Sequence, residues 1–381
     1  MGNNDSSDIS IAFVGDIMPG GVLHKQPSGV SVAVKNFLNE FDIRIGTLEC
    51  AIGNEPNFDP VKMGLEQDVI YAPDINLQKL KELGISCVSL ANNHAFDLGK
   101  DGLINTIKQL DAIGIAHCGA GMNIEEASKP AILECKGKKV GFIGLCDNKM
   151  NTVGYVPVAT DMTPGMNSIG NDYISQIKKL RSLVDYVYII VHWGQEHTFW
   201  PDITMFRFAE ICINAGADGI IGGHQHRVQP LITYRRKPIF LGLGNFLFPP
   251  RFLRAPRPMY YPEENEDTSE YPITDSYPWV DRPTYKIWKR LGRIGTIGCI
   301  RILSDNRQEY TMRIVIMNDQ HSVCFPEKNP FKLVERIQLD IVKYTNPDSG
   351  FRGTYKMAKF IRRVLISGTY RLGRLIKRVS S

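Results

Sequence analysis

Short apolar runs alternate along this chain with segments of helical spacing, and a polar cluster follows nearly every run. The runs expected to form strands are 9–14, 43–45, 85–90, 139–145, 186–191, 218–221 and 238–243. Helices are expected at 30–41, 76–83, 102–113, 173–184 and 206–215, several of them closed by a glycine. Repeated strand-then-helix units predict an α/β layered fold, in which ligands bind beyond the carboxyl ends of the strands.

Histidine is concentrated at these strand ends. Five of the eight histidines lie at or just past an apolar run: His94, His192, His197, His224 and His226. Two histidines with one residue between them, as in the run GGHQHR at 222–227, arise by chance about as often as they bind a metal. The equivalent positions of the other histidines favour a metal site.

The strand ends together offer carboxylate, amide and imidazole donors. The candidate ligands are Asp16, Glu49, Asn93, His192, His224 and His226. This set contains no cysteine and suits Zn, Mn or Fe, in one or two sites. Two metals bridged by a carboxylate can generate hydroxide at neutral pH and stabilise a phosphate-like transition state. His94 is then the candidate catalytic residue, as general acid for the leaving group.

Four more polar residues are candidates for contact with the substrate or for support of the ligands. Asn92 directly precedes Asn93. Asp97 either orients His94 or caps the helix expected near 99–103. Glu196, close to His192 in the sequence, is a candidate for either task. Arg227 either meets an anionic group of the substrate or lies on the solvated surface.

Cysteine usage and hydropathy restrict the compartment. The eight cysteines form no CxxC pair and several lie in apolar runs, which predicts buried thiols in a reducing compartment. Residues 1–8 are polar and no apolar run approaches about 18 residues, so neither a signal peptide nor a transmembrane helix is predicted. The expected location is cytoplasmic, with a peripheral position at a membrane as the alternative.

The chain changes character near residue 250. The segment 249–283 is rich in proline, tyrosine and acid and lacks periodicity, which predicts a lid over the site or a disordered insert. Strands are expected again at 295–303 and 310–317, as a hairpin at the sheet edge, and a helix at 332–344. We therefore expect one domain over 1–320, with an insert at about 250–290, and a helical extension over 321–381.

The segment 351–381 contains nine lysines and arginines and no acid, and its apolar residues recur at helical spacing. This pattern predicts a basic amphipathic helix, which can lie on an anionic membrane surface. The alternative is a docked terminal helix with a solvated basic face. Because the basic residues gather in this one tail with few aromatic neighbours, nucleic acid is not the expected partner.

Six blocks of the sequence resemble bacterial capsule-synthesis proteins of the CapA type, which take part in poly-γ-glutamate biosynthesis. The blocks are GDIM at 15–18, LE at 48–49, LANNHAFDLG at 90–99, HWGQE at 192–196, GGHQH at 222–226 and LGNF at 243–246. That family is similar to the calcineurin-like metallophosphoesterases. The resemblance therefore implies a four-layer α/β/β/α sandwich of the metallo-dependent phosphatase type around a binuclear metal site.

Carried over by position, the resemblance gives each candidate ligand a place. It assigns Asp16 and His226 to the first metal, Asn93, His192 and His224 to the second, and Glu49 to the bridge between them. The chain departs from the phosphoesterase pattern twice, with Met18 in place of a histidine and Glu49 in place of an aspartate. The first metal site is therefore expected to be weaker, differently shaped or empty.

Two functions are compatible with these features. One is a metal-dependent hydrolase acting on a phosphoester, or on the amide bonds of an anionic polymer, during capsule or exopolysaccharide production. The other is a non-catalytic accessory protein whose tail recruits it to a membrane-bound synthesis complex. The nearly complete ligand set favours the enzyme, whereas Met18 and the basic tail favour the accessory protein.

We expect that deletion of residues 351–381 abolishes binding to anionic vesicles and leaves the metal site intact, because no proposed ligand lies past His226. Each basic residue near such a surface contributes about 1 kcal/mol, and salt screens the attraction. Vesicle co-sedimentation at low and high salt measures the effect. Equal sedimentation of the full-length and truncated proteins would identify the segment as a structural terminus.

Overall fold

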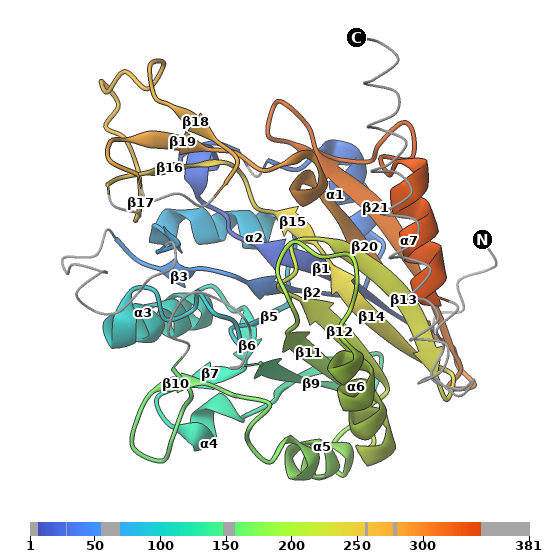
Figure 1. Cartoon of the computed structure of the whole chain (residues 1–381). Coiled ribbons are helices and arrows are strands. Elements are labelled where there is room, and N and C mark those ends of the chain that lie inside the picture. Colours follow the sequence, from blue (N-terminus) through green and yellow to red (C-terminus); the bar gives the residue numbers. More distant parts are fainter. Residues whose placement is uncertain are drawn as a thin grey trace.

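The computed structural model describes residues 7–27, 29–54, 69–147, 157–255, 258–276 and 280–343. Two large sheets lie face to face, and helices cover their outer faces (Figure 1). The helices are α1 (Val32–Asn39), α2 (Gln78–Glu82), α3 (Gly99–Ala112), α4 (Ile124–Ala127), α5 (Tyr173–Arg181), α6 (Ile203–Ala215) and α7 (Leu333–Lys343), with 3-10 turns η1 (Gly21–Leu23), η2 (Asp74–Leu77) and η3 (Arg290–Arg293). The predicted basic helix at 351–381 lies outside the described residues.

The first sheet has eight strands. Its order is β22 (Val323–Cys324), β21 (Gln308–Met317), β20 (Ile294–Ile302), β1 (Ile9–Ile17), β2 (Ile43–Leu48), β5 (Cys87–Ser89) and β6 (Ala116–Cys118), and β15 (Asn245–Leu247) also pairs with β1. β1, β2, β5 and β6 are parallel. The predicted hairpin of β20 and β21 is confirmed, because β20 pairs antiparallel with both β1 and β21.

The second sheet has six strands. Its order is β13 (Val228–Tyr234), β14 (Lys237–Leu243), β12 (Gly219–Gly223), β11 (Tyr186–His192), β9 (Lys138–Cys146) and β8 (Ala131–Cys135). The four inner strands are parallel, whereas β13 and β8 pair antiparallel at the two edges. The carboxyl ends of β9, β11, β12 and β14 therefore open at one side of the molecule, as α/β layering predicts.

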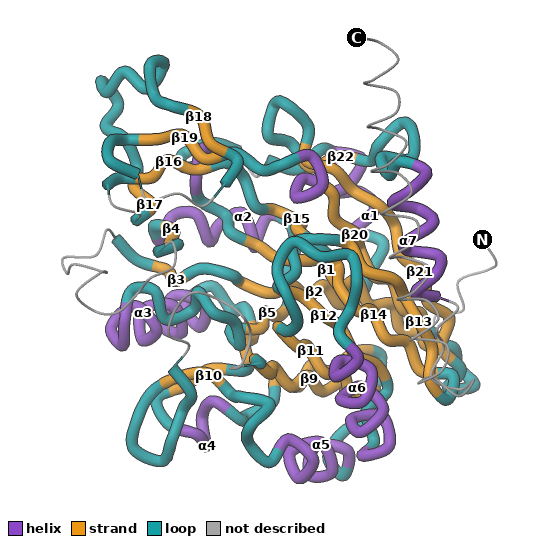
Figure 2. The backbone as a smooth tube through the Cα atoms, in the orientation of Figure 1, coloured by secondary structure: helices purple, strands orange, loops and turns teal. Residues whose placement is uncertain are grey.

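An apolar layer holds the two sheets together. Phe13 of β1 contacts Phe142 and Tyr188 of the second sheet, with ring centroids 6.3 and 5.6 Å away. Side chains of α1, α2 and α3 pack in a separate core outside the first sheet, and those of α5 and α6 outside the second. These layers confirm the four-layer α/β/β/α sandwich, and Figure 2 shows the strands lying between the helices.

Three local predictions need correction. β1 does not end at Val14, because Asp16 and Ile17 still pair with β2 and β15. The helix expected at 76–83 is split into a 3-10 turn and the short α2. The described part of 249–283 is not a disordered insert, because it carries short strands between irregular stretches. Their two or three residues are too few to show alternation.

These strands form a separate small sheet. Its order is β17 (Met259–Tyr260), β16 (Arg251–Leu253), β19 (Thr284–Lys286) and β18 (Ile273–Thr274). The two remaining pairs are β3 (Ala51–Ile52) with β4 (Tyr71–Ala72), and β7 (Ala120–Gly121) with β10 (Gly165–Met166). In the part of the chain that the structure describes, no helix is both long and apolar enough to span a bilayer.

Replacement of Phe142 by Ala is expected to lower the free energy of unfolding by about 3–5 kcal/mol, because the ring is fully buried between the sheets and its loss leaves a cavity. Val32→Ala is the control, since Val32 is 71% exposed and its loss is expected to change stability by about 0.5 kcal/mol or less. Urea unfolding measures both variants. An equal effect of the two would contradict the assignment of this layer as the core.

Candidate metal centre

The predicted ligands come together where the parallel strands of both sheets end. Asp16 is the penultimate residue of β1, Glu49 directly follows β2, and His192 is the last residue of β11. Asn93 follows β5, and His224 and His226 follow β12. All six side chains are buried.

Glycines let these strand ends approach one another closely. A Cβ atom on Gly223 would lie 2.7 Å from Oδ1 of Asp16, and one on Gly222 would lie 2.1 Å from the carbonyl oxygen of Leu241. His224 and His226, just beyond, have φ angles of 93° and 47°, which non-glycine residues rarely adopt. Such backbone strain persists only where the surroundings hold it, and it is concentrated at functional sites.

Two groups of ligand atoms share one carboxylate. Glu49 forms one group with His192 and His224 and a second with Asp16 and His226, and the ligand atoms of each group lie within 4.8 Å of one another. Oε1 of Glu49 lies 3.3 Å from Nε2 of His192 and 3.5 Å from Nε2 of His226. Asn93 joins the first group, since its Oδ1 lies 2.9 Å from Nε2 of His192.

The chemistry of these donors fits a cation. Oδ1 of Asp16, both carboxylate oxygens of Glu49, Nδ1 of His192 and Nε2 of His224 are buried and form no hydrogen bond with any described residue. Buried polar atoms are costly without a partner, and a metal cation would accept these lone pairs.

Electrostatics point the same way. Burial raises the pKa of Asp16 to about 7 and that of Glu49 well above its usual range. Burial, reinforced by neighbouring imidazoles, lowers the pKa of His224 to about 3 and those of His192 and His226 well below the usual value. The imidazoles are therefore neutral and available as ligands, and a divalent cation would offset the cost of two buried carboxylates.

His94 lies beside this cluster, held by two predicted neighbours. Asp97 Oδ2 lies 2.7 Å from Nδ1 of His94 and also accepts from the backbone N–H of Ile70. The Asn92 side chain accepts a hydrogen bond from the backbone N–H of His94. Its amide donates to the carbonyl oxygen of Leu48, the residue before Glu49. The alternative role for Asp97 is wrong, because α3 begins at Gly99 and Leu98 occupies its N-cap without a side-chain bond.

Arg227 contacts His226, and Glu196 lies close to His197. Arg227 is buried and its guanidinium donates to the carbonyl oxygen of His226 at 2.7 Å, so the solvated-surface interpretation of this arginine is wrong. Glu196 is partly exposed and lies 3.7 Å from His197. Its charge raises the pKa values of Asp16 and Glu49, although less than burial does.

Met18 lies two residues after Asp16 and supplies no nitrogen to the group formed by Asp16, Glu49 and His226. Its side chain is fully buried, and its sulfur accepts a hydrogen bond from the backbone N–H of Gly20 at 3.3 Å. A residue that the sequence analysis gave no role, Asn245, lies there instead, with Oδ1 2.8 Å from Nδ1 of His226. Its position two residues after the apolar run 238–243 is the signal that identifies it.

Trp288 and Phe248 were also missed. Their ring centroids lie 4.9 and 5.5 Å from that of His226, which makes them an aromatic border of the centre. Both follow the last predicted parallel strand, in a region without recognisable motifs. Only the tertiary structure brings them to the site.

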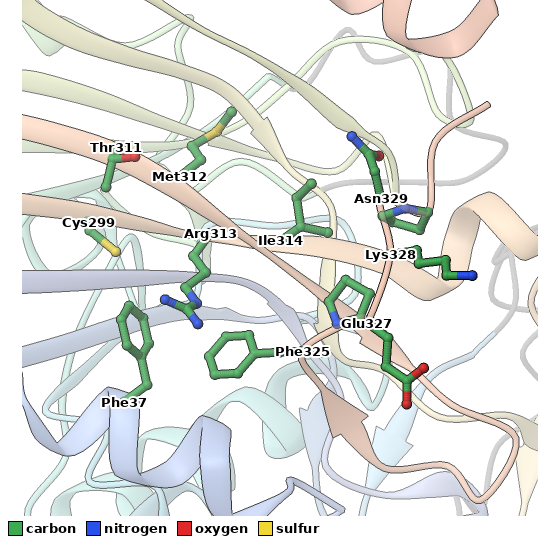
Figure 3. A pocket seen from close by; sticks show the side chains of 12 residues that line it. Phe37, Cys299, Thr311, Met312, Arg313, Ile314, Phe325, Glu327, Lys328 and Asn329 are labelled. Carbon is green, nitrogen blue, oxygen red and sulfur yellow. The ribbon is translucent and has the colours of Figure 1, made fainter. Parts of the chain in front are cut away.

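A separate groove on the outer surface contains none of the predicted site residues. It has a volume of about 560 Å³ and lies between α1, β21 and the segment 325–330. Figure 3 shows Arg313 there between Phe37 and Phe325, and its guanidinium carbon lies 4.9 and 4.2 Å from their ring centroids. With no cluster of metal donors in its lining, this groove is distinct from the metal centre.

Fold and site define an α/β/β/α sandwich protein with a buried centre able to hold one or two metal ions. The model of the family described as bacterial capsule synthesis protein PGA_cap matches residues 10–250. The chain belongs to this family.

The chain is 27% identical over 258 residues to the capsule biosynthesis protein CapA of Bacillus anthracis, covering 65% of this chain and 61% of that protein. It is also 27% identical over 253 residues to the PGA biosynthesis protein CapA of Bacillus subtilis, with 63% of each covered. The match thus spans less than two thirds of these relatives. The NAD nucleotidase of Haemophilus influenzae aligns over 84% of this chain and 60% of its own, with a TM-score of 0.37 and 11% identity, too low to bear on function.

His224→Ala is expected to reduce metal content sharply, because it removes a candidate ligand. The loss of metal affinity should exceed the roughly 10- to 100-fold loss caused by removing a residue that supports a ligand. His94→Ala is expected to retain metal. His117→Ala is the control, since this histidine pairs with Asp111 away from the centre. Elemental analysis after reconstitution with Mn, Zn or Fe measures all three, and equal metal loss from the His224 and His94 variants would contradict their separate roles.

Proposed function

We propose that this protein is a metal-dependent hydrolase of capsule or poly-γ-glutamate production, acting on a phosphoester or amide bond of an anionic polymer. The observation that carries the proposal is the position of Glu49, whose buried carboxylate belongs to both groups of ligand atoms. A carboxylate shared in this way is the arrangement that two neighbouring metal ions require. The names of the CapA relatives support the biological context.

Bound metal would activate a water molecule and polarise the bond to be cleaved. The residues that would hold it are Asp16 and His226 on one side, Asn93, His192 and His224 on the other, and Glu49 between them. The surrounding strand ends orient these groups, because their backbones are fixed by sheet pairing and by the two glycines before His224. Precise orientation of this kind is what a hydrolytic centre needs from its protein.

His94 is assigned as general acid. Asp97 accepts a hydrogen bond from Nδ1 of His94, which fixes the orientation of the ring. Since Nδ1 is engaged, the proton for the leaving group is on Nε2 of His94. Asp97 is itself held by the N–H of Ile70, so the pair is fixed before a substrate binds.

A non-catalytic accessory protein is the second candidate. The buried thioether of Met18 stands in place of the histidine of the phosphoesterase pattern. The group formed by Asp16, Glu49 and His226 therefore has one nitrogen ligand fewer. A relative from Mycobacterium tuberculosis, 28% identical over 181 residues and covering 45% of this chain and 47% of that protein, is named a probable polyglutamine synthesis accessory protein. An anionic polymer is the expected partner in both cases.

His94→Ala is expected to lower turnover by about 100-fold with metal retained, because general acid catalysis contributes at least this much. The assay measures hydrolysis of a generic phosphodiester and of a γ-glutamyl anilide by the metal-loaded protein, and metal content is measured alongside. His24→Ala is the control, because His24 bonds Asn76 outside the centre. If the metal-loaded wild type hydrolyses neither substrate, the accessory function is favoured.

A further inference from the structure

The small sheet formed by β16 to β19 brings a second set of polar side chains to the metal centre. Trp288, two residues beyond β19, is 7% exposed and packs between His226 and Phe248, with ring centroids 4.9 and 5.1 Å away. His197, on the loop after β11, lies 6.3 Å from Trp288 and 5.9 Å from His226, and a third of its side chain is exposed. The border of the centre is therefore open beside His197.

The indole N–H of Trp288 is buried and has no hydrogen-bond partner among the described residues. An indole nitrogen donates and does not accept, so an oxygen atom of a ligand would satisfy it. Buried donors without a partner are rare in folded proteins and call for an explanation. This one lies beside a metal ligand, where a substrate must come.

Two arginines flank the indole, and a buried lysine lies on the same face of the small sheet as one of them. Nζ of this lysine, Lys286, donates to the carbonyl oxygen of Ser276 at 2.6 Å. Arg251 and Lys286 are directly opposite each other on β16 and β19, which places both side chains on one face of the small sheet, and each is 2% exposed or less. The guanidinium carbon of Arg251 lies 5.8 Å from the Trp288 ring. A Cβ atom on Gly292 would lie 2.7 Å from the Trp288 ring and 3.1 Å from Nη1 of Arg227, so these two side chains flank the same glycine. We call Arg227, Arg251 and Lys286 the cationic wall.

The positive charges of the cationic wall act on His197, which lies beside His226 at the edge of the centre. The pKa of His197 is lowered to about 4, first by burial and then by Arg227, Lys286 and Lys289. Arg251 also opposes, as a lesser effect, the raised pKa of Glu49. The acids nearby include Glu196, 3.7 Å from His197, and Asp275, 3.8 Å from Nζ of the exposed Lys289. Asp319 lines a pocket together with Trp288 and lies 2.8 Å from Nη2 of Arg293.

We propose that Trp288 and the cationic wall form a subsite for an oxyanion of the substrate, a carboxylate or a phosphate group, next to the bond that the metal centre cleaves. The inference rests on the proposed function, since it concerns the substrate of that same centre. Cations surrounded by protein attract an anion strongly because little water screens them, and the indole N–H adds direction. An uncharged analogue of the anion lacks the charge that these cations attract.

Binding calorimetry with the metal-loaded, full-length protein tests the subsite without requiring turnover. The probes are glutarate, inorganic phosphate and glutaramide, the uncharged analogue of glutarate. We expect glutarate or phosphate to bind and glutaramide to bind at least about tenfold more weakly. The two anions distinguish a carboxylate from a phosphate subsite, and failure of both to bind would overturn the proposal.

Two variants separate the subsite from the metal ions. Trp288→Phe keeps the ring packing and removes only the N–H, so anion affinity should fall by about three- to tenfold. Lys286→Met should lower it by about tenfold or more, and Lys286→Arg should restore much of it. Lys139→Met is the control for loss of charge, because Lys139 is half-exposed near the start of β9, at the opposite end of the sheet.

Metal content and melting temperature are measured for each variant. Unchanged anion affinity in Trp288→Phe and Lys286→Met, with metal retained, would show that the anion contacts the metal ions alone and would overturn the proposal. Because these measurements do not depend on hydrolysis, an inactive wild-type protein would count against the proposed function and leave the subsite standing.

Discussion

The structure depends on the burial of two carboxylates, Asp16 and Glu49, among three neutral imidazoles. No described residue donates a hydrogen bond to either oxygen of Glu49, and burial raises the pKa values of both acids. A protein gains no stability from such a cluster, since each desolvated charge costs free energy. Burial of the apolar layers offsets this cost, and a bound cation would remove much of it. The chain is therefore less stable at a site whose donors suit a metal ion.

Sheet pairing makes the cluster rigid. β1 lies beside β2 in the first sheet, so Asp16 and Glu49 are neighbours, and β11 lies beside β12 in the second, so His192 is next to the loop that carries His224. The apolar layer around Phe13 then brings the two sheets together. Backbone hydrogen bonds and core packing thereby place the strand ends. Contacts within the site then hold the donors, as between Asn93 and His192 and between the His224 N–H and Oδ2 of Asp16. The centre should keep its geometry when a metal ion leaves.

The site has two parts: the candidate metal ligands, which lie within the family match, and the small sheet, which lies after it. The match ends at residue 250, and all the metal-ligand candidates lie before that point. Arg251, Lys286 and Trp288 lie after it, on or beside the small sheet that borders His226. This division suits a common metal centre combined with a separate surface for substrate recognition. Specificity would then change through the sheet without disturbing the metal ligands.

The sequence by itself determined the α/β class, most strand positions and the set of candidate donors, because hydrophobic periodicity and polar strand ends are local properties of the chain. It could not show that β1 continues through Asp16, since only pairing with β2 and β15 extends that strand. It also left two roles open for Asp97 until the position of α3 excluded one. The tertiary structure alone brought Phe248 and Trp288 to His226, because contacts between distant segments depend on how the sheets pack and leave no periodic trace in the sequence.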